Sequence, residues 1–552
     1  MSLGRIPRWV WAVAASMFAI MALLTALLVI LPSAPIQRVL GGSYGVLDRN
    51  QPSYYYPDGL LISLAEGSEA ARVRVRDIPR ETFIADRAGR KWQVAHAALA
   101  DHLVPLSPLY VIEVQGEGRI VAEVSIAASA ETLAQVDLYA WDERTGAWVF
   151  VPAVLNAGHQ ALAFRPQRTP INVMAVQVRP TTFVAGAVVS ADTDDVGASY
   201  GLALLAGVAV DAAGNLNGKP AASQASTVLP LVVNPSEGFT AYQDASASSV
   251  LIQRLVALAS SYDGLALDFT PGTGYASFVA ALAERLHEHG KRLDLILRST
   301  ALAGADPAAL ALAADRLWLA PGNHPADYLP GGAVERALDS LTRQVSRTQI
   351  GLLVNAYDVD AIGGLAFTTS LAEATAHFGH VEAVVGYLDP DQPRVAAGSS
   401  LPLALSGSVE ALGYDDALGM YYLIYRDEGG TQHHVYLATA QAVRRKLEWA
   451  RRYALGAVGV EGLAKADSPA YLTDGLSAFL GEQPLGPPPP LQIVWQARDE
   501  SGVLLAEEAG DLSLKQYLWQ VPHQAGRYTI GALLRGGGWE ITLGEIAVEV
   551  VR

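Results

Sequence analysis

The chain has 552 residues, of which 51% are hydrophobic and 17% charged, so we expect two to four folded domains with large cores rather than a disordered protein. A net charge of −16 argues against a nucleic-acid partner, which is bound through basic patches. The sequence contains no cysteine, which excludes disulfides, thiolate metal ligands and cysteine nucleophiles.

The N-terminus carries an apolar segment, Val10–Leu31, that is long enough to cross a bilayer. Arg5 and Arg8 precede it without any acidic residue, which predicts a cytoplasmic start and an extracytoplasmic remainder. A cleaved signal peptide is the alternative, but its apolar core is normally shorter, and the best cleavage site runs into proline at Ser33–Pro35. We therefore expect residues 1–35 to be a cytoplasmic stub and an uncleaved signal anchor in the cell membrane.

Short alternating strands follow in residues 36–180, for example Arg72–Arg76 and Ile120–Ile126. Period-two alternation between turn signals predicts an antiparallel β-sandwich, for which we expect a spacer or adhesive role. Trp141 and Trp148 could form a platform for a sugar, although packing at a sheet edge is the simpler interpretation.

Residues 181–482 change to strands that alternate with helices. The clearest unit is an apolar strand around Leu265–Phe269, a helix from Tyr275 to Gly290 and a second strand at Leu293–Leu297. Strand, helix and strand form the repeating unit of a parallel α/β barrel or open sheet. In barrels the chemistry lies at the carboxyl ends of the strands, which is where Asp268 and Thr270 fall.

The stretch Asp263-Gly-Leu-Ala-Leu-Asp-Phe-Thr270 resembles the D-G-x-D-x-D-x-E signature of glycoside hydrolase family 18, the chitinase-like barrels. The resemblance implies a (β/α)8 TIM barrel in which the final glutamic acid protonates the leaving glycosidic oxygen while the substrate's acetamido group attacks. The first and third acids are present as Asp263 and Asp268, but Ala266 replaces the supporting acid and Thr270 the proton donor. A threonine hydroxyl cannot lose its proton near neutral pH, so the signature predicts the fold and argues against the activity.

Other segments extend the resemblance over about 300 residues and show two further departures from the family pattern. Thr227–Asn234 is similar to the third strand of the spore-cortex branch, and His433–Val460 to the last helix and strand. The family's Tyr-Asp pair is replaced by Pro321-Gly322, and its strand-eight tryptophan by Glu461. Asp467–Pro469 resembles the family's E-D-P turn.

Three segments complete the predicted architecture. A small α+β insertion is expected at about 393–433, a Pro-rich linker at 483–490, and an immunoglobulin-like β-sandwich at 491–552. His433 and His434 are adjacent on a strand and point to opposite faces, so we expect no metal site there, and no cofactor is expected. Asp358 and Asp360 could form a carboxylate pair, although solvation in a loop is the simpler interpretation.

Three functions remain open. The first is a catalytically inactive barrel that binds glycans containing N-acetylglucosamine, such as chitin-like chains or peptidoglycan. The predicted ligand contacts are Asp268, Trp318, Asn355, Tyr357 and Glu461. The second is a structural envelope protein that binds other proteins. The third is an active glycosidase in which Asp268 and Glu461 form a relocated carboxylate pair.

Overall fold

The computed structural model describes residues 44–552 except 128, 157, 192–196, 235–238, 240, 385–392, 464–471 and 538. The predicted membrane segment Val10–Leu31 and the turn Asp467–Pro469 lie outside these residues. Of the helices in the described part, none is long and apolar enough to span a bilayer. The chain divides into two compact units, residues 1–179 and 180–552, where the sequence changes from alternating strands to strand–helix repeats.

The first unit contains two antiparallel sheets around one core. One sheet has the strand order β1 (Gly45–Leu47), β4 (Ala71–Ile78), β6 (Leu109–Gln115), β12 (Ile171–Val178), β8 (Val136–Asp142) and β9 (Ala147–Val151), with β5 (Leu103–Pro105) also paired to β12. The other has the order β10 (Val154–Asn156), β11 (Ala161–Phe164), β7 (Ile120–Ser125), β3 (Leu60–Leu64) and β2 (Ser53–Tyr56). Their alternating apolar residues form one buried cluster, so the predicted antiparallel arrangement is confirmed.

The two tryptophans of this unit pack inside it. Trp141 is 6% exposed. The Trp148 indole N–H donates, at 2.7 Å, to the carbonyl of Ala95, which belongs to helix α4 (Arg90–Ala97). Phe83, on α3 (Arg80–Ile84), contacts the Trp148 ring edge-on. The packing interpretation of these residues therefore fits the structure better than a sugar platform.

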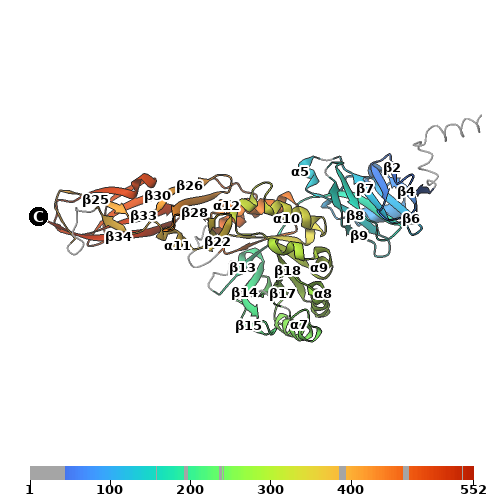
Figure 1. Cartoon of the computed structure of the whole chain (residues 1–552), viewed down its shortest axis with the longest axis horizontal. Coiled ribbons are helices and arrows are strands. Elements are labelled where there is room, and N and C mark those ends of the chain that lie inside the picture. The colour runs from blue at the N-terminus through green and yellow to red at the C-terminus, as the bar shows by residue number, and fades with distance from the viewer. Residues whose placement is uncertain are drawn as a thin grey trace, which may run out of the picture. The chain divides into compact units, whose positions relative to one another are not determined.

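The second unit contains the barrel (Figure 1). Its eight parallel strands in the described chain are β13 (Val184–Val189), β14 (Leu202–Val210), β16 (Thr227–Val233), β17 (Gly264–Asp268), β18 (Arg292–Arg298), β19 (Arg316–Ala320), β20 (Ile350–Asn355) and β29 (Ala457–Glu461). Pairing of β13 with both β29 and β14 closes the sheet, and β15 (Leu216–Gly218) forms a hairpin on β14. The predicted eight-stranded TIM-type barrel is confirmed.

Helices surround the barrel, and local sequence explains where they begin and end. They are α6 (Gly197–Tyr200), α7 (Ala245–Ala259), α8 (Tyr275–Glu288), α9 (Pro307–Ala313), α10 (Ala333–Thr342), α12 (Ala440–Arg452) and α13 (Leu472–Leu480). The side chains of Asp244 and Thr439 accept N–H bonds at the starts of α7 and α12. Gly290 follows α8 with a φ of 65°, a conformation that glycine adopts without strain.

Side chains fill the barrel interior. Trp318 is fully buried there beside Ala266, and its indole N–H donates to Asp294 Oδ2 at 2.8 Å. A Cβ at Gly351 would lie 2.4 Å from the Trp318 ring, so the ring occupies space that only glycine leaves free. Asp294 is 0% exposed and pairs with Arg292 at 2.7 Å, while burial raises the pKa of its carboxyl.

Strands from two distant parts of the chain build the rest of the second unit. The earlier part contributes β21 (Asp358–Ile362), β22 (Leu365–Thr369), α11 (Leu371–Ala376), β23 (Val381–Ala383), β24 (Arg394–Ala396), β25 (Ser400–Leu405), β26 (Val409–Asp415), β27 (Met420–Arg426) and β28 (Gln432–Leu437). The later part contributes β30 (Gln492–Asp499), β31 (Leu504–Gly510), β32 (Gln516–Gln520), β33 (Gly526–Gly536) and β34 (Trp539–Val551).

These two parts form one composite domain (Figure 1). Strand β25 pairs with β32, and β24 pairs with β34. Leu403 from the first part and Trp495 and Trp519 from the second belong to one buried cluster. From the sequence, the insertion and the immunoglobulin-like segment are expected to be separate modules, whereas the structure joins them around a single core.

Candidate functional site

The carboxyl ends of the barrel strands bring charged side chains together at one end of the barrel. Asp268, Arg298 and Glu461 are the last residues of β17, β18 and β29, and Asn355 is the last residue of β20. Because all eight strands are parallel, these four residues lie at the same rim, which is where barrel proteins place their sites.

Arg298 connects the two carboxylates of this rim. Its Nε lies 3.1 Å and its Nη2 2.5 Å from Asp268 Oδ2, and its Nη1 lies 3.7 Å from Glu461 Oε2. Strands β18 and β29 are not neighbours, so the guanidinium reaches across the mouth. Burial lowers the pKa of Arg298, but its hydrogen bonds to Asp268 and the charges of Asp268 and Glu461 outweigh burial and raise it. The arginine therefore stays charged and lies between the two carboxylates.

Tyr357 completes this group, which we call the mouth cluster: Asp268, Arg298, Tyr357 and Glu461. Burial, the charge of Glu461 and a hydrogen bond to that residue raise the pKa of Tyr357, so its phenol is protonated and donates to Glu461. Gly462 has a φ of 83°, and a Cβ there would lie 2.5 Å from the tyrosine ring. The glycine thus lets the ring pack directly on the end of β29.

The side chains at the other positions of the signature are not part of the mouth cluster. Thr270 is exposed just beyond β17, where its N–H donates to Asn234 Oδ1 at 3.1 Å and its carbonyl accepts from the Tyr242 hydroxyl. Ala266 is 0% exposed inside the barrel. Asp263 precedes β17 at the opposite end, where it accepts the Val228 N–H at 2.8 Å.

Two of the five predicted ligand contacts, Trp318 and Asn355, are buried in the barrel instead. Trp318 is buried below the mouth, as described above. Asn355 is 5% exposed, and both its backbone carbonyl and its Oδ1 accept from Lys446 Nζ at 2.9 Å, while its Nδ2 donates to Asn323 Oδ1 at 2.9 Å. Neither Trp318 nor Asn355 is therefore accessible to a ligand at the mouth.

Lys446 is a buried cation directly beneath the rim. It projects from α12, is 4% exposed and lies 5.0 Å from the centre of the Tyr328 ring. Burial lowers its pKa to about 7, although the charge of Asp358 opposes that change. The Lys446 amino group therefore donates to Asn355, and it loses its proton near neutral pH.

Asp358 and Asp360 do not act as a pair. The Asp358 carboxylate accepts the Ala438 N–H at 2.6 Å, whereas Asp360 contacts His433 Nδ1 at 2.8 Å. His433 also stacks on Tyr425, with ring centroids 4.4 Å apart. In the described part of the chain no three or more His, Asp or Glu side chains are grouped as a metal site would require.

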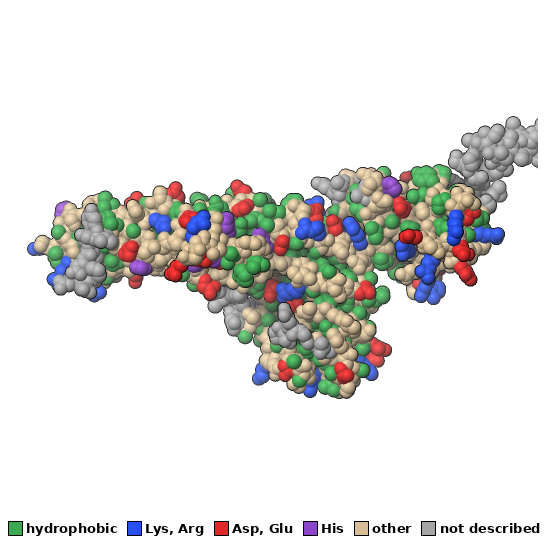
Figure 2. All heavy atoms as spheres, in the orientation of Figure 1, with side chains coloured by type: hydrophobic (Ala, Val, Ile, Leu, Met, Phe, Trp, Pro, Cys, Tyr) green, Lys and Arg blue, Asp and Glu red, His purple; other side chains and the backbone are tan. Residues whose placement is uncertain are grey.

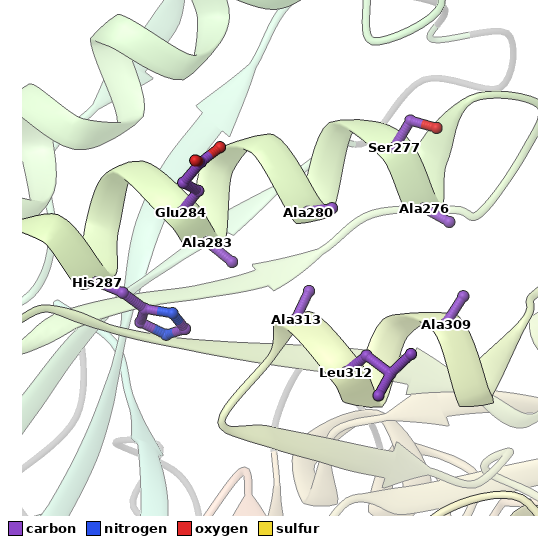
Figure 3. A pocket seen from close by; sticks show the side chains of 9 residues that line it. All are labelled: Ala276, Ser277, Ala280, Ala283, Glu284, His287, Ala309, Leu312 and Ala313. Atoms are coloured by element: carbon purple, nitrogen blue, oxygen red, sulfur yellow. The ribbon is translucent and has the colours of Figure 1, made fainter. Parts of the chain in front are cut away.

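A groove of about 490 Å³ lies elsewhere, between α8 and α9 on the outside of the barrel (Figure 3). Small side chains line it, with Ala276, Ala280 and Ala283 facing Ala309 and Ala313. Leu312 stands at its edge and is 91% exposed. Ser277, Glu284 and His287 also line the groove, which contains no member of the mouth cluster.

Arg298 is the one member of the mouth cluster that is not among the residues predicted from the sequence. It follows the predicted strand Leu293–Leu297 directly, so its position at the rim could have been derived from the strand pattern. Its pairing with Asp268 and Glu461 depends on which strands face each other across the barrel.

No protein-family model and no curated protein matches the chain. Among solved structures, the chitinase from Chromobacterium violaceum is 19% identical over 53% of this chain and 99% of its own, with a TM-score of 0.39. The spore cortex-lytic enzyme SleL from Bacillus megaterium is 14% identical over 76% of this chain and 97% of its own, with a TM-score of 0.40. Catalytic domain 2 of the Ostrinia furnacalis Group II chitinase, solved with penta-N-acetylchitooctaose, is 13% identical over 56% of this chain and 98% of its own, with a TM-score of 0.39. The sequence identities are low, and the assignment of a barrel is based on the strand pairing described above rather than on these similarities.

Proposed function

We propose that this chain is a non-hydrolytic barrel protein that binds glycans containing N-acetylglucosamine, chitin-like or from peptidoglycan, outside a membrane to which residues 10–31 anchor it. The observation that carries the proposal is the position of Arg298, which binds Asp268 and reaches Glu461 across the barrel mouth.

The same observation opposes hydrolysis. Two-carboxylate glycosidases need one protonated carboxyl group as acid, and that group's pKa must be raised. Here both carboxylates, Asp268 and Glu461, instead face the Arg298 guanidinium. Thr270, at the position of the family's proton donor, cannot supply the missing acid.

Binding is the use that this set of groups supports. Sugar hydroxyl and acetamido groups both donate and accept hydrogen bonds, and the mouth cluster offers guanidinium N–H groups, carboxylate oxygens and a phenol. Asp268, Arg298 and Glu461 stand on strand ends, and Tyr357 packs on Gly462, so little side-chain freedom is lost when a ligand binds. The carboxylates remain accessible at 13% and 24% exposure, and the arginine at 42%.

A structural scaffold is the second candidate. Trp318 and Asn355 are buried, and the composite domain shares one core between two distant segments, as a rigid load-carrying block would require. On this account the ion pairs of the mouth cluster only link the ends of the strands.

The two candidates separate in a binding titration of the full-length chain, purified in detergent, with N-acetylglucosamine oligomers. On the binding account, Tyr357→Phe and Glu461→Gln weaken the affinity at least tenfold. Arg394→Gln, which removes an exposed ion pair with Glu549 away from the barrel, leaves it unchanged. No binding by the unaltered chain would favour the scaffold.

A further inference from the structure

Three charged side chains lie at the amino end of the barrel interior, at the other end from the mouth cluster. Ile296 on β18 and Trp318 on β19 belong to the interior core. Since alternate residues of a strand point to the same face, Arg292 and Asp294 on β18 and Arg316 on β19 also face the interior. Asp294 and Arg316 are partners in the strand register. Two guanidinium groups are therefore placed beside one carboxylate.

Other donors occupy the Asp294 carboxylate. Arg292 Nε and Nη2 donate to Oδ1 at 3.0 and 2.7 Å, Arg292 Nη2 also donates to Oδ2 at 3.0 Å, and the Trp318 indole N–H donates to Oδ2 at 2.8 Å. These four bonds use the lone pairs that a carboxylate offers. In the described chain Arg316 Nε and Nη1 are enclosed and have no hydrogen-bond partner. The centre of the Trp318 ring lies 5.5 Å from Arg316 Cζ, and this cation–π contact leaves both N–H groups without an acceptor.

The other two buried cations of the described chain, Arg347 and Lys446, both have acceptors. Lys446 donates to Asn355, and Arg347 Nη1 donates to the Tyr453 carbonyl at 3.0 Å. Cations at the surface are solvated instead, and Figure 2 shows them interspersed with acidic side chains on one face. Arg316 is only 9% exposed, so water does not replace the acceptors that its two enclosed N–H groups lack.

The charges around Arg316 do not compensate for its burial. Burial and the charge of Arg292 lower the pKa of Arg316, and the charges of Asp294 and Asp315 only partly oppose this change. At Arg298, by contrast, hydrogen bonds to a carboxylate outweigh burial. A buried charge without a partner is costly, and its usual explanation is a bound water or ion. A water molecule can accept an N–H bond, but it brings no negative charge.

We propose that Arg316 binds a small inorganic anion of halide size, such as chloride, at the amino end of the barrel. The anion supplies both the missing acceptor and the missing negative charge. Arg316 keeps 9% of its surface exposed and is the first residue of β19, so the anion lies where the strand begins, outside the filled interior. A halide fits better than a phosphate because only one guanidinium is free here, Arg292 being bound to Asp294. This site is independent of glycan binding at the mouth.

The test follows the unfolding of the full-length chain in detergent while chloride replaces fluoride at constant ionic strength. An anion that binds only the folded chain stabilises it increasingly once its concentration exceeds the dissociation constant. We expect the denaturant midpoint of the unaltered chain to rise with chloride and that of Arg316→Met to stay constant. A midpoint of the unaltered chain that does not depend on chloride would overturn the proposal and would mean that water alone satisfies the arginine. Parallel rises in both proteins would place the anion elsewhere and overturn it as well.

Arg316→Met should fold, because an apolar side chain of similar size in place of an unpaired buried charge is often neutral or stabilising. Without chloride this variant should be at least as stable as the unaltered chain. A constant loss of stability at every chloride concentration would mean that Arg316 acts through protein contacts alone.

A second measurement detects the ion directly. The nuclear magnetic resonance line of chloride broadens when the ion exchanges with a protein site. Part of this broadening should be lost in Arg316→Met and retained in Arg394→Gln, the matched control, which removes an exposed arginine that pairs with Glu549. Equal broadening by Arg316→Met and the unaltered chain would contradict the site.

Discussion

Arg298 and Asp268 end neighbouring strands of the barrel, and the guanidinium of the first binds the carboxylate of the second through two nitrogen atoms. In the chitinase-like signature that this stretch resembles, the third acid stands two residues before the proton donor. Here that acid is bound by an arginine, and Thr270 stands at the position of the donor.

The first prediction is that Thr270→Glu alone does not create a chitinase. The new carboxyl would stand beyond β17 without a supporting acid, since Ala266 is buried among apolar residues and Asp268 is bound to Arg298. Release of a fluorogenic group from chito-oligosaccharides measures this, with Thr270→Gln as the control of equal size. Turnover above that control would show that the other departures from the signature do not matter.

The second prediction concerns Arg298→Met. Without the guanidinium, Asp268 loses its two-nitrogen contact and Glu461 loses the cation that lies 3.7 Å from it. The variant should therefore lose unfolding free energy relative to the unaltered chain, by about 1 kcal/mol because the site is partly solvated.

Arg298→Lys is the matched control, since it keeps the charge without the two-nitrogen contact. Denaturant unfolding of the three proteins gives the comparison. Equal unfolding free energies for the Met variant and the unaltered chain would mean that the guanidinium does not hold the two carboxylates.

The third prediction uses Lys446, whose pKa is lowered to about 7 by burial. Between pH 7 and the ordinary lysine value of about 10.4 the unfolded chain binds one proton more than the folded chain, so stability rises with pH in that window. The slope for one proton is about 1.4 kcal/mol per pH unit. Lys446→Met should lack this contribution, and unfolding measured from pH 7 to 9 in both proteins tests it; parallel curves would contradict the assignment.

The fourth prediction is that Gly351→Ala destabilises the barrel. The added Cβ would meet Trp318 at 2.4 Å in a filled interior, which typically costs about 1–3 kcal/mol. Gly304→Ala is the control, because its Cβ would have no neighbour within 4 Å. Equal unfolding midpoints for the two variants would show that the indole can move aside.

The fifth prediction tests the composite domain. Leu403→Ala on β25 and Trp519→Ala on β32 should each lower the stability of the same unfolding transition by about 2–5 kcal/mol, because both side chains belong to one core. Leu365→Ala, at a position 64% exposed, should have little effect. Two transitions, each shifted by only one of the variants, would mean that the segments fold separately.

The sequence predicts the barrel well because each strand is a short apolar run bounded by turn residues. The signature strand was expected at Leu265–Phe269 and is found at Gly264–Asp268. The composite domain is not predictable in this way, since β25 and β32 are separated by more than 100 residues and their pairing leaves no local pattern. The sequence offers Trp318 as an aromatic residue that could stack on a sugar, but its ring is buried in the barrel interior. Arg298 gains its role only from the closure of the sheet.

The measurement that tests the central claim most directly is a titration of the full-length chain with N-acetylglucosamine oligomers and peptidoglycan fragments, in which binding and product release are followed together. The account predicts saturable binding without cleavage, with affinity lost in Glu461→Gln. Cleavage that Asp268→Asn or Glu461→Gln abolishes would contradict it and reveal a relocated active site, and no binding of any fragment would leave the barrel as a scaffold.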